Sequence, residues 1–260
     1  RAHPRYRNER SGRHDEELGA SDCTGECGKP LDSNGFHALT CLVGGLVIRR
    51  HHSLRDAFAA VGREAGYAAA TEVYEPRWTR ARENAEGQWE VEQARLDCRF
   101  DGPPSDPLTY GDVVVSHPEA TAWVRAAADQ DGATAEAAAK GKHQRYPAWA
   151  LSGGRLVPLS VETFGRWGKE ALDWLRAAAD EACARSPQLA ALGEWGRPAV
   201  LGAWHCRLSV ALQKGNAACL LQAGKLRGAA DFVGDTGWEE DIDDLLREAA
   251  VFAAAGGMEA

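Results

Sequence analysis

Four potential metal ligands lie close together in the N-terminal part of the sequence. Cys23, Cys27, His37 and Cys41 are spaced C-x3-C-x9-H-x3-C. Two thiolates, an imidazole and a third thiolate form the ligand set of a closed tetrahedral zinc site, and the short spacers let one turn present both members of each pair. Glycine, proline, serine and asparagine between the two pairs supply the turn that would bring them together. The sequence therefore predicts a structural zinc knuckle over residues 21–48.

Plainer interpretations of these residues remain open at this point. Cysteine is often buried as a small apolar residue, and a lone histidine is often a surface residue. A disulfide is a further alternative, but no apolar leader indicates secretion. We expect an intracellular protein, nuclear or cytoplasmic and not secreted, in which the scattered cysteines are ordinary reduced residues: Cys98, Cys183, Cys206 and Cys219.

A basic segment follows the predicted knuckle and opens an amphipathic helix. Its positively charged or titratable members include Arg49, Arg50, His51 and Arg55. Basic side chains gathered on one helix are the electrostatic footprint of nucleic-acid binding. We therefore expect these four side chains to contact DNA or RNA.

Composition limits the class of protein. A chain of 260 residues with 44% hydrophobic content can bury one core and a small appended module. No segment approaches the roughly 20 apolar residues that cross a bilayer, so no membrane partner is expected. The formal net charge of −8 argues against a protein that coats nucleic acid over its whole surface. Residues 225–260 hold three Lys or Arg against nine Asp or Glu, which leaves room for a basic groove elsewhere.

The spacing of apolar residues predicts alternating helices and strands. Helices are expected over 53–65, 119–145 with a break near 131–132, 168–184 and 199–221. Strands are expected over 70–74, 90–100, 109–116 and 155–163, with an irregular insertion over 75–90 and a loop over 102–107. This order indicates an α/β fold, most simply a small mixed sheet flanked by helices.

The same patterns divide the chain into five parts. Residues 1–20 are polar, rich in arginine and without periodicity, so we expect a flexible leader there. The zinc knuckle is followed by an α/β core over 49–184, a helical C-terminal extension over 185–224 and an acidic tail over 225–260.

Three acidic residues lie within or beside the predicted strands. Asp97 falls inside one strand, and Asp112 directly precedes three consecutive valines in the next. A charged group beside an apolar strand is costly unless it has a function there. Two adjacent strands joined by a loop bring both carboxylates to one edge of the sheet, where they would hold Mg²⁺. Glu162, in the apolar strand over 155–163, is a third, supporting acid.

Positive residues on the intervening helix complete this group. Lys140, Lys142 and Arg145 would neutralise phosphate charge or orient a water molecule. Each feature alone has a simpler interpretation, because acids at strand ends are often solvated turn residues and basic runs are often solvated helix faces. The combination of knuckle, basic helix, strand acids and helix lysines favours a metal-dependent nuclease.

In the order of these motifs, residues 21–180 resemble the restriction-like endonuclease domain of site-specific non-LTR retrotransposons, a branch of the PD-(D/E)XK superfamily. The C-C-H-C knuckle of that family matches the four ligands named above, and its Arg-His helix start matches Arg50 and His51. Its two acids match Asp97 and Asp112.

The family's lysine and tyrosine on the following helix match Lys142 and Tyr146, with Lys140 nearby. Two positions depart from the family pattern, since Leu96 replaces a proline and Val114 replaces the superfamily lysine. The resemblance implies a restriction-endonuclease-like core in which these residues act with Mg²⁺.

The resemblance also implies a function and partners. The domain would nick target DNA to give a 3′ hydroxyl that primes reverse transcription, with a reverse transcriptase in the same polyprotein and element RNA as a second nucleic-acid partner. Structural zinc and catalytic magnesium are the implied metals. The departures at Leu96 and Val114 favour an alternative function, a catalytically inactive remnant that binds DNA or RNA through the knuckle.

Overall fold

A computed structural model describes residue 27 and residues 32–83, 87–102, 107–148 and 154–223 of the chain. Its α-helices are α1 (Phe36–Thr40), α2 (Leu46–Glu64), α3 (Val124–Asp129), α4 (Ala133–Arg145), α5 (Lys169–Arg185), α6 (Pro187–Ala191) and α7 (Gly196–Ala223). Its strands are β1 (Ala68–Tyr74), β2 (Arg80–Glu83), β3 (Trp89–Glu92), β4 (Arg95–Asp101), β5 (Leu108–Ser116) and β6 (Gly154–Glu162). Two short 3-10 turns are η1 (Pro76–Trp78) and η3 (Gly193–Trp195).

The central sheet has the strand order β1-β4-β5-β6. β1 pairs antiparallel with β4, and β4 pairs antiparallel with β5, whereas β5 and β6 run parallel. A parallel pair needs a crossover connection, and α3 and α4 provide it. The predicted fold class, a small mixed sheet flanked by helices, is confirmed.

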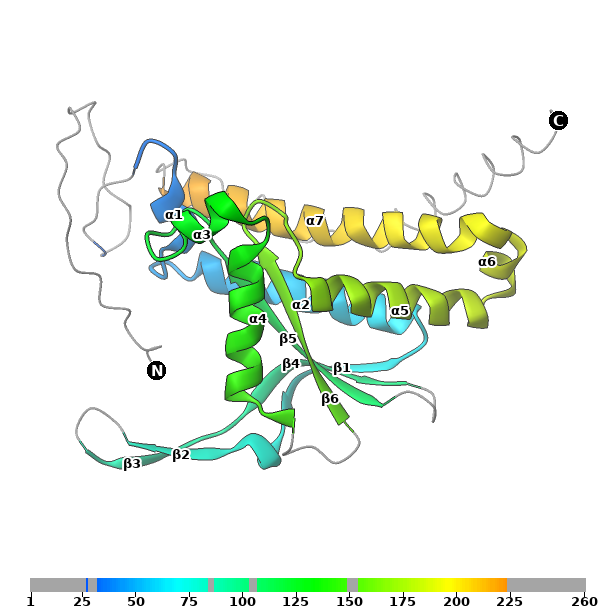
Figure 1. The fold of residues 1–260 in the computed structure, drawn as a ribbon, viewed down its shortest axis with the longest axis horizontal. Helices are drawn as coiled ribbons and strands as arrows, with labels where there is room; N and C mark the ends of the chain where they lie inside the picture. Colours follow the sequence, from blue (N-terminus) through cyan, green and yellow to red (C-terminus); the bar gives the residue numbers. More distant parts are fainter. Residues whose placement is uncertain (1–26, 28–31, 84–86, 103–106, 149–153, 224–260) are drawn as a thin grey trace.

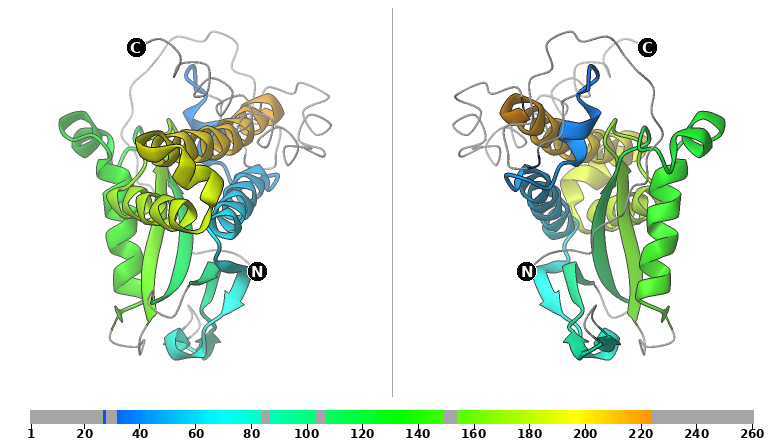
Figure 2. Two further views of the ribbon diagram at one scale, coloured as in Figure 1. Left: turned by 90° about the vertical axis from the view of Figure 1, so that its right-hand side faces the viewer. Right: turned by 90° about the vertical axis from the view of Figure 1, so that its left-hand side faces the viewer.

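Helices cover both faces of this sheet. α4 packs against β5 and β6 on one face, and α2 and α5 pack on the other. α7 lies across α2 and α5 as an outer layer (Figures 1 and 2). The main core lies between the sheet and these three helices, and it includes Phe58, Val113, Leu159, Leu175 and Leu208. Because α7 contributes to this core, residues 196–223 are packed as part of the α/β unit.

α2 begins earlier than the sequence predicts. It starts at Leu46 after the left-handed Gly45 and therefore includes the whole basic segment over 49–55, of which the predicted helix over 53–65 contained only the end. It ends before Gly66, whose φ of 90° suits a residue without a Cβ. The boundary expected between knuckle and core at residue 48 thus falls inside one helix. The expected break near residue 132 is present, because α4 begins after the left-handed Gly132.

The sequence predicts an irregular insertion over residues 75–90, but its described residues, 75–83 and 87–90, contain regular secondary structure. It contains η1 and a hairpin formed by β2 and β3, and this hairpin extends away from the central sheet (Figure 1). The single strand expected over 90–100 is accordingly divided into β3 and β4. The residues of β2 show no apolar alternation, and the alternating Trp89 and Val91 of β3 are 73% and 71% exposed, so the described residues of the hairpin form no buried face. A cross-strand ion pair between Arg80 and Glu92, at 2.8 Å, stabilises it instead.

Several sequence predictions fall outside the described residues. These are the leader over 1–20, the ligand Cys23, most of the loop over 102–107 and the acidic tail over 225–260. Within the part of the chain that the structure describes, none of the helices combines the length and apolar character needed to span a bilayer.

Candidate active site and metal cluster

The two aspartates predicted to form a pair lie where β4 and β5 separate. The ladder between these strands ends at the pair Cys98 and Gly111, so the next residues across are Asp97 and Asp112. Their side chains are buried, with 8% and 4% of each residue exposed. Beyond the ladder, the N–H of Val113 donates to Asp97 Oδ2 at 2.7 Å, so the side chain replaces a backbone partner. The sheet thus brings the two carboxyl groups together, close enough to share a hydrogen bond.

His51, on α2, reaches the point where β4 and β5 separate. Its Nε2 lies 3.1 Å from Asp97 Oδ2 and 3.1 Å from the carbonyl oxygen of Val113. Burial alone would lower the pKa of His51, but the hydrogen bond and charge of Asp97 outweigh burial and raise that pKa above its ordinary value. Burial alone would likewise raise the pKa of Asp97, but its bonds to His51 and neighbouring donors lower it. Asp97 is therefore the more acidic member of the aspartate pair.

The pKa of Asp112 is shifted in the opposite direction. Burial raises its pKa to about 6, and the charge of Asp97 adds to this effect, while the ammonium group of Lys142 opposes it. Lys142 Nζ lies 2.7 Å from Asp112 Oδ2, which is an ion pair. That buried oxygen has no well-aligned hydrogen-bond donor among the described residues. The site thus holds two adjacent carboxyl groups with different proton affinities, which is a common arrangement in catalytic centres.

The other two residues expected from α4 and its end lie in different surroundings. Tyr146 is buried in a small cluster with Trp78, whose ring centre lies 5.2 Å from its own. Burial, followed by the charge of Asp112, raises the pKa of Tyr146 to about 12. Lys140 is exposed. Because residues two apart lie on different faces of a helix, only Lys142 of the two lysines meets the aspartates.

Glu162 is not brought to the aspartate pair. It lies at the end of β6 opposite Ser116, four residues beyond Asp112 along β5. At about 3.3 Å per residue, that displacement amounts to about 13 Å. Its carboxylate accepts hydrogen bonds from the N–H and the hydroxyl of Thr134, at 3.1 and 2.7 Å. Glu162 thus satisfies a donor in the first turn of α4, a structural task.

The basic segment is largely occupied by contacts within the protein. Arg50 is only 2% exposed and donates to Asn216 Oδ1 at 2.7 Å and to the carbonyl oxygen of Leu39 at 3.1 Å. Arg55 forms ion pairs with Asp56 and Glu72.

The helical periodicity explains why a basic residue of this segment is buried rather than exposed to a nucleic acid. Arg50 lies four residues before the buried Leu54 and eight before Phe58, so it belongs to the buried stripe of α2. Of the four residues expected to contact nucleic acid, Arg49 alone is exposed.

Three of the four predicted zinc ligands form a cluster. One ligand atom from each of Cys27, His37 and Cys41 lies within 4.8 Å of the other two. Cys27 Sγ is 3.3 Å from His37 Nε2. Among the residues that the structure describes, this is the one group of three such side chains able to hold a metal ion. The fourth expected ligand, Cys23, lies outside the described residues.

Asp32 orders the backbone around this cluster. Its carboxylate accepts from the N–H groups of Asn34, Phe36 and His37, at 3.0, 2.9 and 2.6 Å. These bonds satisfy donors at the start of α1, which carries His37. From residue 32 onward, the predicted turn therefore has a hydrogen-bonded conformation that leads into the helix carrying the imidazole.

Sequence reasoning missed Glu75, a buried acid at the end of β1 that bonds to Arg77 in η1 and to Tyr110 on β5. It accepts from the Tyr110 hydroxyl at 2.5 Å and from the Arg77 guanidinium at 2.7 and 2.8 Å. The bonds from Arg77, which outweigh burial, lower the pKa of Glu75 to about 2. The one signal in the sequence was the dipeptide Glu75-Pro76 at the end of a strand.

Comparisons with models of protein families, with curated proteins and with solved structures find no match to this chain.

Proposed function

We propose that this chain is a divalent-metal-dependent DNA endonuclease whose catalytic centre is formed by Asp97, Asp112 and Lys142. The observation that carries the proposal is the direct contact of two buried carboxyl groups with a lysine 2.7 Å from one of them. Burying charged groups costs free energy. Acids and a lysine without a shared function would therefore be expected to stay in solvent rather than to meet at one buried point.

The order of these groups in the fold supports the resemblance to the retrotransposon endonuclease domains. A helix carrying His51 precedes two antiparallel strands that carry the aspartates, and the next long helix carries Lys142. The mixed sheet is also compatible with a restriction-endonuclease-like core. On this proposal the domain nicks target DNA, and the resulting 3′ hydroxyl primes reverse transcription by a polymerase in the same polyprotein.

The aspartate pair fits a magnesium ion. Mg²⁺ is commonly held by one or two carboxylates and keeps several waters for the remaining positions. Asp112 Oδ2 is a buried oxygen without an aligned donor, and burial, with the charge of Asp97 added to it, raises the pKa of Asp112. A cation between the two carboxyl groups would offset both effects. When bound, the ion would supply a Lewis acid for the scissile phosphate. Lys142 balances the charge of Asp112 and would stabilise the charge that develops on the phosphate.

The cluster of Cys27, His37 and Cys41 fits structural zinc. Thiolates and imidazole are the ligands that zinc prefers, and the three ligand atoms are already within 4.8 Å of one another. With Cys23 as the fourth ligand the site would be closed, so it would have no open position for catalysis. On this proposal the knuckle binds nucleic acid, either target DNA or element RNA, beside the nuclease core.

A nicking assay tests the proposal. The purified chain should convert supercoiled plasmid to nicked circles in Mg²⁺, and the double variant Asp97→Ala with Asp112→Ala should abolish this conversion. Lys142→Ala should reduce the rate by about 100-fold, the usual loss for one electrostatic group in a catalytic site. The matched control is Lys140→Ala, which removes the same charge from an exposed position of α4 and should leave the rate unchanged.

The same assay distinguishes an active endonuclease from the alternative, an inactive remnant that only binds DNA. A chain that shifts duplex DNA in a gel at low salt but does not nick it would be an inactive DNA-binding remnant, the function that Val114 in place of the superfamily lysine favours. Equal nicking by the wild type and the double aspartate variant would show that the activity belongs to a contaminant or to another site.

A further inference from the structure

The backbone of β1 is distorted directly opposite Asp97, on the side of β4 away from Asp112. Glu72 has a φ of 56° and is the one residue other than glycine with a positive φ in the described ranges. The register between β1 and β4 joins Thr71 to Cys98 and Val73 to Leu96, and skips the intervening pair. A left-handed glutamate in a strand is strained, and such strain persists where surrounding contacts enforce it.

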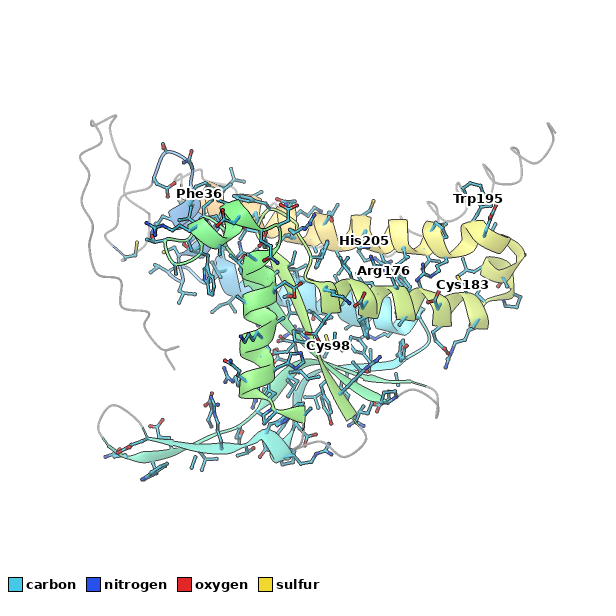
Figure 3. The ribbon with its side chains drawn as sticks, viewed as in Figure 1. Phe36, Cys98, Arg176, Cys183, Trp195 and His205 are labelled. Atoms are coloured by element: carbon cyan, nitrogen blue, oxygen red, sulfur yellow. The ribbon has the colours of Figure 1, made fainter. Side chains whose placement is uncertain are left out.

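The side chain of Glu72 indicates which contact enforces this conformation. Its carboxylate forms an ion pair with the guanidinium of Arg55 on α2. Arg55 lies one helical turn after His51, the residue that contacts Asp97. The carbonyl oxygen of Arg55 also accepts from the thiol of Cys98 at 3.5 Å (Cys98 is labelled in Figure 3).

Two neighbouring points thus join α2 to the strands around the aspartates. At one point His51 contacts Asp97, and at the other Arg55 contacts both Glu72 and the residue after Asp97. A rotation or a slide of α2 would break both contacts together, because residues i and i+4 lie on one helix face.

We propose that Glu72 is a positioning residue for the aspartate pair. Its left-handed backbone turns the carboxylate towards α2, and its ion pair with Arg55 fixes the helix so that His51 holds Asp97 against Asp112. This inference rests on the proposed nuclease function, because the geometry that Glu72 maintains is that of the proposed catalytic carboxylates. The Glu72 side chain is 45% exposed, but that of Arg55 is only 14% exposed, so the pair is screened less than one between two solvated side chains.

The test uses the variant Glu72→Gly in the full chain. Glycine adopts a φ of 56° without strain, so this change removes the carboxylate and leaves the backbone conformation accessible. Arg55→Gln removes the other partner, and the double variant completes a cycle that measures whether the two side chains act as one unit. The matched control, Asp180→Asn, removes one charge from the ion pair with Arg197 on the distant α5–α7 surface.

Two quantities are measured for each variant. One is plasmid nicking in Mg²⁺, separated into kcat and the KM for DNA. The other is the ¹⁵N chemical shift of the His51 ring, assigned with His51→Gln, which reports the contact with Asp97 whether or not the protein cleaves DNA.

We expect Glu72→Gly to lower kcat about tenfold or more, as misplacing a catalytic group by a fraction of an ångström does, with KM within twofold of wild type. The His51 ring shift should move, Arg55→Gln should show the same changes, and the double variant should be no worse than either single one. Asp180→Asn should match wild type in both measurements.

Wild-type values of kcat and of the His51 shift in Glu72→Gly would overturn the proposal, as would defects that multiply in the double variant. A wild-type chain that does not nick DNA would overturn the proposed function instead. In that case the His51 shift still decides whether Glu72 positions the contact with Asp97.

Discussion

Replacing Asp112 with asparagine should remove a pH-dependent loss of stability that the wild-type chain carries. The folded protein holds the Asp112 carboxyl with a pKa of about 6, whereas the ordinary value is 3.8. Between these two values the unfolded chain has released the proton and the folded chain has kept it. The free energy of unfolding of the wild type therefore falls as the pH rises through this interval. Asparagine has nearly the same size and cannot ionise. The free energy of unfolding of the variant should therefore not fall in this way as the pH rises.

The size of this effect follows from the two pKa values. Each tenfold change in proton affinity corresponds to 1.36 kcal/mol, so a rise from 3.8 to about 6 corresponds to about 3 kcal/mol. This figure needs no large discount for solvent screening, since Asp112 is only 4% exposed. Asparagine also leaves Lys142 without its anionic partner, but that side chain is 23% exposed and remains partly hydrated. The pKa of about 6 already includes the attraction between Lys142 and the Asp112 carboxylate, so the loss of this partner adds no second pH-dependent effect.

The assay is urea unfolding at a series of pH values from 4.5 to 8. The nine tryptophans of the chain provide the fluorescence signal. The difference in unfolding free energy between Asp112→Asn and wild type should grow by about 2 to 3 kcal/mol across this range, with unchanged m values. Asp101→Asn, which removes a half-exposed carboxylate from the neighbouring strand β4, is the matched control and should run parallel to wild type.

Parallel pH profiles of Asp112→Asn and wild type would refute the reasoning, because the buried carboxyl would then not carry a raised pKa. A difference that shrinks as the pH rises would refute it more strongly, since it would mean that the folded state favours the ionised form of Asp112. Acid-induced loss of stability below about pH 4 comes from carboxyl groups with lowered pKa values, among them Asp97 and Glu75, and lies largely below the measured window.

Three further predictions concern packing and metal binding. Gly62→Ala should destabilise the fold by about 1–3 kcal/mol in urea unfolding, because its Cβ would lie 2.5 Å from the buried ring of Phe100. Gly141→Ala places its Cβ in open space and should stabilise α4 by about 0.5–1 kcal/mol. Arg50→Met should cost about 1–3 kcal/mol because it leaves a buried amide oxygen unsatisfied, and Arg49→Met should change stability by less than about 0.5 kcal/mol. Elemental analysis of the purified chain should find one zinc per molecule, and Cys41→Ser should release it; a metal-free wild type would contradict the zinc assignment.

The parts of this protein that follow from local sequence could be predicted without a structure. Ligand spacing in the knuckle is a local property, and the cluster of Cys27, His37 and Cys41 agrees with it. The alternation of apolar residues likewise gave the fold class and most helices and strands, because helix and strand periods are written directly in the chain. The meeting of Asp97 and Asp112 was also accessible, since only a short loop separates their strands.

Positions that depend on packing between distant segments were decided by the tertiary structure. A buried and an exposed arginine look alike in sequence, and only the packing of α2 against α7 buries Arg50 beside Asn216. Glu162 looks like a third active-site acid until the parallel register of β6 places it opposite Ser116. The sequence by itself determined which chemical groups the chain carries and the local elements that hold them. Tertiary structure decided which groups from distant segments share a site, because strand register and helix packing join residues that no local period relates.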